Sequence, residues 1–201
     1  MHRLFSLIAA SILFASNPAA AAVEIGAAAP DFSATDINGA PVKLSALKGK
    51  VVVLEWTNHQ CPFVVKHYKP GNMQAVQKAA KEQGAIWIAI NSSAAGKEGH
   101  LADGAAAQAV VKEQGSNATH IILDAAGAIG KLYGAKTTPH MFVIDANGAL
   151  AYMGAIDSKA TASSDDIKDA TNYVTNAVAS LVKGVPVEPA STQPYGCSVK
   201  Y

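Results

Sequence analysis

The pattern of apolar and polar positions predicts alternating strands and helices. Continuous apolar runs at residues 51–56 and 85–90 are typical of strands that are covered on both faces of a sheet. Between them, residues 63–83 carry apolar side chains at helical spacing, with an interruption expected at Pro70-Gly71. A strand, a helix and a second strand in this order indicate a βαβ unit.

The second half of the chain continues this alternation and adds a β-hairpin. Asn147-Gly148 is a strong hairpin turn signal, and the polar residues 163–166 supply an N-cap and first-turn acids for a final helix. The expected elements are a helix at 105–114, a strand at 120–123, a short helix at 128–133, strands at 141–145 and 149–153, and a helix from 163–166 to 183–184. The order is therefore βαβ followed by ββα.

The first residues predict export. Residues 1–22 combine Arg3, an apolar run at residues 4–15, a turn at Asn17-Pro18 and a series of small residues, as in a secretory signal peptide. The apolar run is too short to span a bilayer, and no later segment is longer. We expect cleavage near Ala22 and a mature protein in the periplasm of a Gram-negative bacterium, without a membrane span.

Composition and charge indicate one domain of ordinary size. Of the 201 residues, 50% are hydrophobic and 15% are charged, which is enough for a substantial core. We expect the domain at residues 23–184, with an N-terminal hairpin at 32–47, and a tail at 185–201 that forms a strap or a mobile end. Without Arg3 the 16 basic residues become 15, equal to the 15 acidic ones. Because the chain has no cluster of basic residues, nucleic-acid binding is excluded.

Cys61 is the strongest candidate for chemistry. It follows the first strand closely and precedes Pro62, a residue that is favoured at the first position of a helix. This places Cys61 at the N-cap, where the helix dipole and unpaired N–H groups favour a thiolate. The alternative is a small buried hydrophobic residue.

A second candidate feature is the Thr138-Pro139 pair just before the strand at 141–145. A cis peptide bond there would direct backbone toward the Cys61 loop, whereas a trans proline in a loop is the commoner case. His140 would then face the same site.

These features together resemble the thioredoxin superfamily. Trp56, Cys61-Pro62-Phe63-Val64, Thr138-Pro139 and the ββα ending are similar to the redoxin branch, which contains the alkyl hydroperoxide reductase and thiol-specific antioxidant proteins. The resemblance is strongest to the peroxiredoxin-like group with a single active-site cysteine. It implies an α/β fold: a three-layer α/β/α sandwich with a central mixed sheet and an N-terminal hairpin extension. It also implies that Cys61 is the nucleophile and Pro139 the cis-proline, with Trp56, Pro62, Thr138 and His140 around the substrate.

The chain departs from the family patterns at two places. Val64 replaces the second cysteine of a Cys-x-x-Cys motif, and Thr57 lies four residues before Cys61 where the peroxiredoxin pattern has three. Cys197 in the tail could supply the missing partner. A disulfide between Cys61 and Cys197 could resolve an oxidised Cys61 or act as a structural link, or Cys197 could be a free thiol, and these alternatives remain open.

Three other side chains near Cys61 in the sequence could take part in its chemistry or have a purely structural position. Glu55 at the end of the first strand could accept a proton near the thiol, or could reach water at the strand end. His59 could stabilise the thiolate, or could be a surface loop residue. His67 is expected on the helix surface or packed by its edge.

The sequence therefore predicts an exported thiol-dependent oxidoreductase that needs no cofactor. Its substrate would be a peroxide or a protein disulfide or thiol, and an external thiol reductant of the thioredoxin type would restore it. Two rival functions remain. Cys61, His59, His140 and Cys197 are ligand types that suit copper delivery, and a thioredoxin-fold groove could also bind a partner without catalysis.

Overall fold

The structure of the protein is a computed structural model that describes residues 23–201. The predicted signal peptide at residues 1–22 lies outside the described residues. Within residues 23–201, no helix combines the length and the apolar character that crossing a membrane requires. The elements in chain order are β1 (Ser33–Thr35), β2 (Pro41–Lys43), η1 (Leu44–Leu47), β3 (Val52–Trp56), α1 (Pro62–Tyr68), α2 (Asn72–Glu82), β4 (Ile86–Asn91), α3 (Gly104–Gln114), β5 (His120–Leu123), α4 (Ala128–Tyr133), β6 (Thr137–Thr138), β7 (His140–Ile144), β8 (Leu150–Gly154), η2 (Ser164–Asp169), α5 (Tyr173–Val182) and β9 (Cys197–Ser198).

The central sheet has five strands in the order β5-β4-β3-β7-β8. Strands β3, β4 and β5 are parallel, whereas β7 pairs antiparallel with β3 and β8 pairs antiparallel with β7. Every residue of β3 is buried, as the continuous apolar run predicted for a central strand. The mixed thioredoxin-like sheet expected from the sequence is therefore confirmed.

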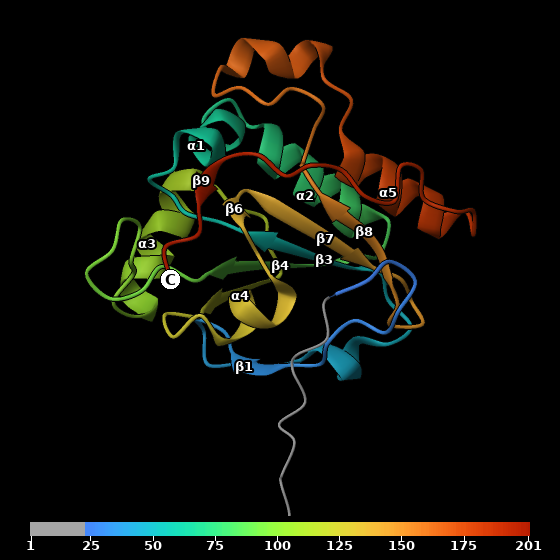
Figure 1. Ribbon diagram of the computed structural model, residues 1–201. Helices are drawn as coiled ribbons and strands as arrows, with labels where there is room; N and C mark the ends of the chain where they lie inside the picture. Colours follow the sequence, from blue (N-terminus) through green and yellow to red (C-terminus); the bar gives the residue numbers. More distant parts are fainter. Residues whose placement is uncertain (1–22) are drawn as a thin grey trace, which may run out of the picture.

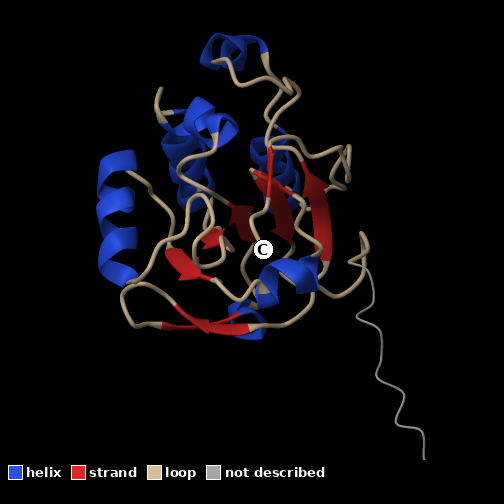
Figure 2. Cartoon of the chain, turned by 60° about the vertical axis from the view of Figure 1, so that its left-hand side comes forward, coloured by secondary structure: helices blue, strands red, loops and turns tan. Residues whose placement is uncertain are grey.

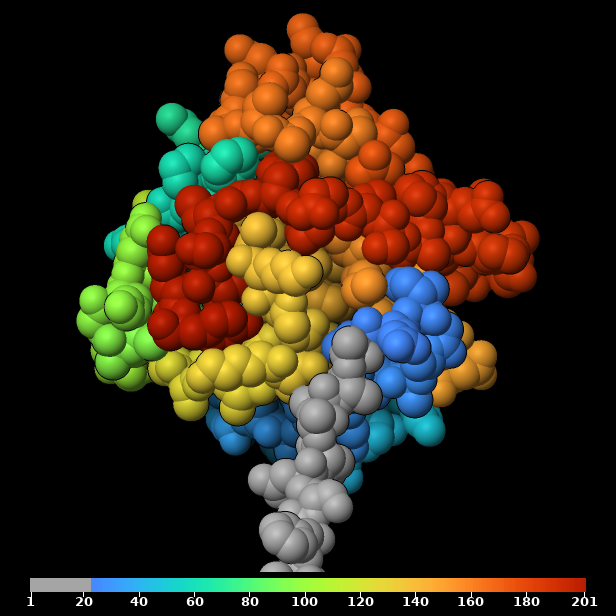
Figure 3. Space-filling model, viewed as in Figure 1, coloured from blue at the N-terminus to red at the C-terminus, as the bar shows by residue number. Residues whose placement is uncertain are grey.

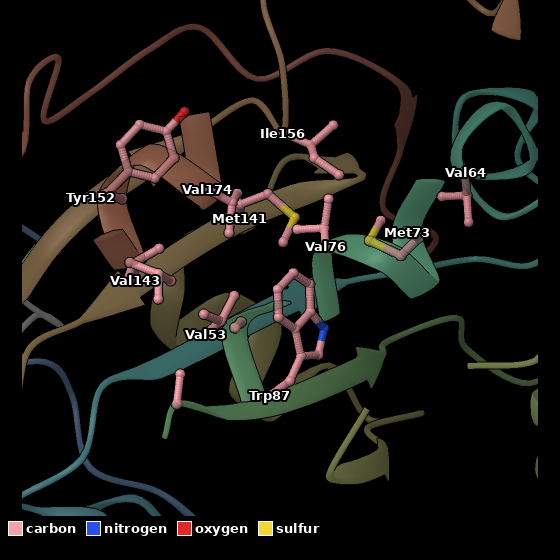
Figure 4. Packing of buried hydrophobic residues seen from close by; sticks show 14 of the residues in the cluster. Val53, Val64, Met73, Val76, Trp87, Met141, Val143, Tyr152, Ile156 and Val174 are labelled. Atoms are coloured by element: carbon pink, nitrogen blue, oxygen red, sulfur yellow. The ribbon is translucent and has the colours of Figure 1, made fainter. Parts of the chain in front are cut away.

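Helices lie on both faces of this sheet (Figures 1 and 2). A hydrophobic cluster packs against each face. On one face, α1, α2 and α5 pack on side chains such as Val53, Trp87 and Met141, which Figure 4 shows gathered together. On the other face, α4 and the N-terminal hairpin pack against Trp56 and Phe142. Because successive strand residues point to opposite faces, Glu55 and Trp56 belong to different layers. The result is the predicted α/β/α sandwich.

Both predicted hairpins are present, and their turns have a local physical cause. In the N-terminal hairpin, the Asp36 carboxylate accepts hydrogen bonds from the backbone N–H groups of Asn38 and Ala40, both at 2.9 Å. Gly39 has a φ of +83°, which a residue with a side chain rarely adopts. The predicted interruption at Pro70-Gly71 is also confirmed, because Gly71 separates α1 from α2.

The prediction of one continuous final helix is wrong. The capping signal at Ser163 is real, but it begins the short 3-10 helix η2, and the backbone is extended at Ala170. A second N-cap then begins α5, where the Asn172 side chain accepts a hydrogen bond from the Thr175 N–H at 2.9 Å. Asn172 also forms a bridge with Asp157. The chain is thereby held against the end of β8 before α5 starts.

The tail forms a strap across the molecule (Figure 3). Its backbone bonds successively to β8 and then to the segment before β7, through the pairs Thr192 N–Met153 O and Val199 N–Lys136 O, both at 3.1 Å. Near the chain end, the Tyr201 hydroxyl donates to the Ala135 carbonyl at 2.9 Å. Of the two expectations for residues 185–201, the structure therefore supports the strap.

Candidate functional site

Cys61 occupies the N-cap of α1, and Pro62 is the first helical residue, as the sequence predicts. The Cys61 carbonyl accepts hydrogen bonds from the N–H groups of Val64 and Val65, both at 2.9 Å, which begin the helix. Its side chain is 0% exposed. Cys61 is thus held at a helix N-terminus in a closed site.

Cys197 meets Cys61 from the tail. The two sulfur atoms lie 2.6 Å apart, and both cysteines are free thiols in the structure. The Cys61 Sγ also lies 3.1 Å from the carbonyl oxygen of Thr138. The Thr138-Pro139 peptide bond is cis, and the antiparallel pairing of β6 with β9 sets Thr138 opposite Cys197. Four sequence-predicted residues, Cys61, Cys197, Thr138 and Pro139, therefore lie together.

The two thiols differ in acidity. Burial raises the pKa of Cys61, but hydrogen bonds from the Cys197 thiol and from the Val64 N–H outweigh it, so the net shift of this pKa is downward. Burial, together with the neighbouring Cys61 sulfur, raises the pKa of Cys197 to about 12. Cys61 is therefore the sulfur that can carry the negative charge and attack.

A buried polar cluster lies next to this site and was not predicted. Lys66 and His67 on α1 are 2% and 0% exposed, and Asp157 is 2% exposed. The Tyr195 hydroxyl, two residues before Cys197, donates to Asp157 Oδ1 and lies 3.3 Å from both Lys66 Nζ and His67 Nε2. Lys66 Nζ also forms an ion pair with Asp157 Oδ2 at 3.5 Å. We call these four residues the tail cluster.

His67 in the tail cluster is a neutral donor. Burial lowers the pKa of His67 to about 4, against the opposing effect of Asp157. The Asn72 side-chain amide donates to His67 Nδ1 at 2.8 Å, which leaves the ring proton on Nε2. Nε2–H therefore donates to the Tyr195 hydroxyl. His67 is fully buried, and the expectation of a surface or edge position is wrong because the helix turns this side toward the tail.

Glu55 is the centre of a second buried cluster. Its carboxylate is 0% exposed and accepts hydrogen bonds from Trp87 Nε1 at 2.8 Å, Tyr68 Oη at 2.9 Å and Gln77 Nε2 at 3.2 Å. Burial raises the pKa of Glu55, and these donors oppose the rise only in part. Glu55 does not reach water, and Cys61 is not among its hydrogen-bond partners. We call Glu55, Tyr68, Gln77 and Trp87 the Glu55 cluster.

The remaining predicted residues lie apart from the Cys61 sulfur. His140 packs on Phe142 and accepts from the Lys136 N–H at 3.2 Å, and burial lowers its pKa to about 4. Trp56 lies on the same far face of the sheet, where its Nε1 donates to Ser92 Oγ at 3.1 Å. His59 lines a separate cavity of about 470 Å³ with Tyr68 and other residues, and burial lowers the pKa of His59.

Within residues 23–201, no three His, Cys, Asp or Glu side chains are grouped as metal ligands, so the four copper-ligand candidates do not converge.

The sequence holds a weak signal for the tail cluster. Tyr195 is an aromatic residue two positions before Cys197 in the tail, and Lys66-His67 follows Cys61 on one helix. Asp157 carries no such signal, because it lies in a loop far along the chain. Only the tertiary structure shows that these residues share one pocket.

Comparisons with known proteins agree with this geometry. Two solved structures, a hypothetical protein from Sinorhizobium meliloti and an uncharacterised protein from Geobacillus kaustophilus, are each 24% identical and match with TM-scores of 0.71 and 0.72. They cover 90% and 89% of this chain and 96% and 92% of their own chains. A putative thiol:disulfide interchange protein DsbE from Chlorobium tepidum is 28% identical, with a TM-score of 0.51, over 66% of this chain and 85% of its own. No curated protein matches the chain.

The fold and these similarities define a protein of the thioredoxin fold. The Redoxin family model matches residues 24–174. The chain belongs to the Redoxin family, as the resemblance in its sequence implied.

Proposed function

We propose that this protein is an exported thiol–disulfide oxidoreductase in which Cys61 and Cys197 form the redox pair. The observation that carries the proposal is the 2.6 Å approach of the two free sulfur atoms beside the N-terminus of α1. Val64 stands where a neighbouring cysteine would complete a Cys-x-x-Cys motif. Cys197 takes over that role from the tail.

The reaction transfers two electrons from the protein to a partner disulfide. The Cys61 thiolate attacks one sulfur of the partner, a Cys61–partner disulfide forms, and the other partner sulfur leaves as a thiolate that takes up a proton. Cys197 then loses its proton and attacks the Cys61 sulfur, which releases the second partner thiol and leaves a Cys61–Cys197 disulfide. An external dithiol reductant of the thioredoxin type reduces this disulfide again.

The other residues have supporting roles in this proposal. Pro62 begins the helix whose N-terminus stabilises the Cys61 thiolate, and the backbone at Thr138-Pro139 receives the partner peptide. Glu55 is a positioning residue, because it holds α1 to the sheet through Tyr68. We assign indirect roles to three further residues. His59 lies in the loop before Cys61, and Trp56 and His140 pack on the opposite face of the sheet, behind the site.

Disulfide exchange is better supported than peroxide reduction. Cys61 is 0% exposed, and the segment that covers it is an extended peptide paired with β6. A protein substrate can imitate such a segment, whereas a peroxide would need an open path to the sulfur. Export to the periplasm rests on residues 1–22, and disulfide chemistry suits that compartment.

Trapping of the intermediate tests the proposal. Reduced protein is mixed with one equivalent of oxidised glutathione, and the products are identified by mass spectrometry after thiol labelling. Wild type should form the Cys61–Cys197 disulfide and release two molecules of glutathione. Cys197→Ser should stop at a Cys61–glutathione disulfide, and Cys61→Ser should stay unmodified on the same time scale.

Two results would contradict the proposal. If Cys61 stays unmodified in folded Cys197→Ser, it is not a nucleophile for disulfides. If the wild-type disulfide forms but resists an excess of thioredoxin-type reductant while the protein is folded, it is a structural link. Hydrogen peroxide in place of glutathione gives a separate comparison, and we expect slower oxidation of Cys61 by peroxide.

A further inference from the structure

Residues 195–198 occupy the site, and two of them, Cys197 and Ser198, form the short strand β9. β9 pairs antiparallel with β6, so that Cys197 lies opposite Thr138 and its sulfur meets Cys61. Gly196 has a φ of +137°, and a Cβ atom at this position would lie only 2.1 Å from the Thr138 carbonyl oxygen. The tail backbone therefore packs directly on the strand, in a fixed register.

Tyr195 fills the adjoining pocket with its side chain. Its ring packs edge-on against Phe63 with 5.9 Å between centroids, and Lys66 Nζ lies 5.2 Å from the ring centre. Its hydroxyl donates to Asp157 and accepts from Lys66 and His67, which uses its full hydrogen-bonding capacity. The pocket is thus complementary to a phenol, both in its apolar wall and in its polar floor.

This arrangement must open before Cys61 can react with another molecule. Because Cys61 is fully buried, a partner has to displace residues 195–198 from β6. Displacement empties the pocket, and the buried groups of Lys66, His67 and Asp157 lose a hydrogen-bond partner. Buried polar groups without partners destabilise the open state, so this state favours a ligand that replaces the phenol.

We propose that this pocket is a specificity subsite that binds a tyrosine two residues before the reactive cysteine of a partner protein. The partner presents a Tyr-Gly-Cys segment, pairs with β6 as the tail does, and places its cysteine sulfur at Cys61. The middle residue is glycine because a Cβ atom at the position of Gly196 would collide with the Thr138 carbonyl oxygen. The inference rests on the proposed function, since the partner cysteine is one half of the disulfide that Cys61 attacks. A site built around a hydroxyl discriminates strongly against a side chain that lacks it.

The same site then serves both steps of the exchange. The Cys61 thiolate forms a bond with the partner cysteine, and the second sulfur of the partner disulfide leaves as a thiolate. When the tail returns, Cys197 attacks Cys61, the partner cysteine leaves as a thiol, and Tyr195 replaces the partner tyrosine in the pocket. Because Tyr195 and the partner tyrosine compete for one pocket, the return of the tail promotes release of the reduced partner.

The test uses the chain of residues 23–201 with Tyr195→Ala and Cys197→Ser, which empties the pocket and leaves one thiol. Three peptides copy residues 193–199, with tyrosine, phenylalanine or alanine at the position of Tyr195. Each carries its cysteine as a disulfide with 2-thiopyridine. Attack by Cys61 joins the peptide to the protein and releases pyridine-2-thione, whose absorbance gives the rate.

We expect the tyrosine peptide to react about tenfold faster than the phenylalanine peptide, and the alanine peptide to be slowest. Asp157→Asn in the same background should remove most of the difference between tyrosine and phenylalanine. Circular dichroism confirms that each variant is folded, and the three-peptide comparison within one protein stands even if Asp157→Asn does not fold.

Equal rates for the three peptides would overturn the subsite and leave the proposed function intact, because Cys61 still exchanges disulfides. No reaction of folded protein with any peptide would overturn both. A preference for phenylalanine over tyrosine would show that only the apolar wall is used, which also contradicts the proposal.

Discussion

Two buried polar clusters share helix α1 but are built from different parts of the chain. The Glu55 cluster joins β3, α1, α2 and β4, and all its members lie within the domain. The tail cluster joins α1 to Asp157 and to Tyr195 of the tail. Tyr68 serves the first cluster, while the adjacent residues Lys66 and His67 serve the second.

Because of this difference, we expect the two clusters to have different roles, one in the stability of the fold and the other in its function. The Glu55 cluster fastens the Cys61 helix to the sheet whether or not the tail is docked. The tail cluster is complete only when the tail lies over Cys61. The first therefore contributes mainly to folding, and the second mainly to access of a partner to the thiol.

The largest expected effect is a gain in the free energy of unfolding on oxidation, because a Cys61–Cys197 disulfide would hold the tail over the tail cluster. Cys61 and Cys197 are 136 positions apart, and closing a loop of this length stabilises a protein by about 4–5 kcal/mol in the chain-entropy model. Denaturant unfolding of the oxidised and the reduced protein measures the difference. Cys197→Ser is the control, because it cannot form the intramolecular disulfide and should lack this gain in stability. A difference below about 1 kcal/mol would contradict the expected stabilisation by a Cys61–Cys197 disulfide.

The next effect concerns the Glu55 cluster. Glu55→Ala leaves the buried donors of Trp87, Tyr68 and Gln77 without an acceptor, so we expect a loss of about 3 kcal/mol in the free energy of unfolding. Glu82→Ala is the matched control. Glu82 is exposed and pairs with Lys78, and its replacement should cost less than about 0.5 kcal/mol. Similar losses for both variants would contradict a structural role of the Glu55 cluster.

The two clusters should respond to pH with opposite signs. The folded pKa of Glu55 is raised above 4.5, so its contribution to stability is complete below pH 4.5 and is lost as the pH rises through the folded pKa. The folded pKa of His67 is lowered from 6.5 to about 4, so its contribution is complete above pH 6.5 and is lost as the pH falls toward 4.

Unfolding free energies between pH 4 and pH 8 check this prediction. Relative to wild type, Glu55→Gln should gain stability as the pH rises, because the glutamine cannot ionise. His67→Gln should gain relative to wild type as the pH falls. Since both comparisons are made with wild type, the similar titration of His140 cancels. Parallel profiles for wild type and either variant would contradict the assigned protonation state of that residue.

The smallest expected effect is on the rate at which Cys61 is alkylated when one of two hydroxyl groups of the tail is removed. In a Cys197→Ser background, Tyr195→Phe removes one hydroxyl from the tail cluster, and we expect alkylation of Cys61 by iodoacetamide to become about tenfold faster. Tyr201→Phe removes a hydroxyl that donates to the Ala135 carbonyl, away from the tail cluster, and its effect should be smaller. Equal rates in the two variants would mean that Tyr195 does not control access to Cys61.

Much of the fold could be predicted because its signals are local. The apolar run of β3 and the Asn-Gly turns specify their own conformation, and Cys61-Pro62 marks the start of α1. The final helix was predicted as continuous because the Ser163 cap looks the same whether a 3-10 helix or an α-helix follows it. A second cap at Asn172 begins a separate helix, and Asn172 also pairs with Asp157, a long-range contact that the local sequence does not reveal.

The site could be predicted only in part. Cys61, Thr138-Pro139 and Cys197 carry recognisable contexts, and the structure brings them together. His140 was expected beside Cys61, but strand alternation directs its side chain to Phe142 on the far face. The tail cluster depends on where Asp157 and Tyr195 lie in space, and such long-range contacts leave no periodic pattern in the sequence.

The central claim is that Cys61 and Cys197 form one reversible redox pair beneath the tail. The most direct measurement equilibrates the chain of residues 23–201 in glutathione buffers of increasing oxidation and determines the labelling of each cysteine by mass spectrometry. The account predicts that both cysteines lose labelling together in a single two-electron transition, which a thioredoxin-type reductant reverses, with the Cys61–Cys197 disulfide as product. Independent oxidation of the two cysteines, or a disulfide that the reductant leaves intact in the folded protein, would contradict it.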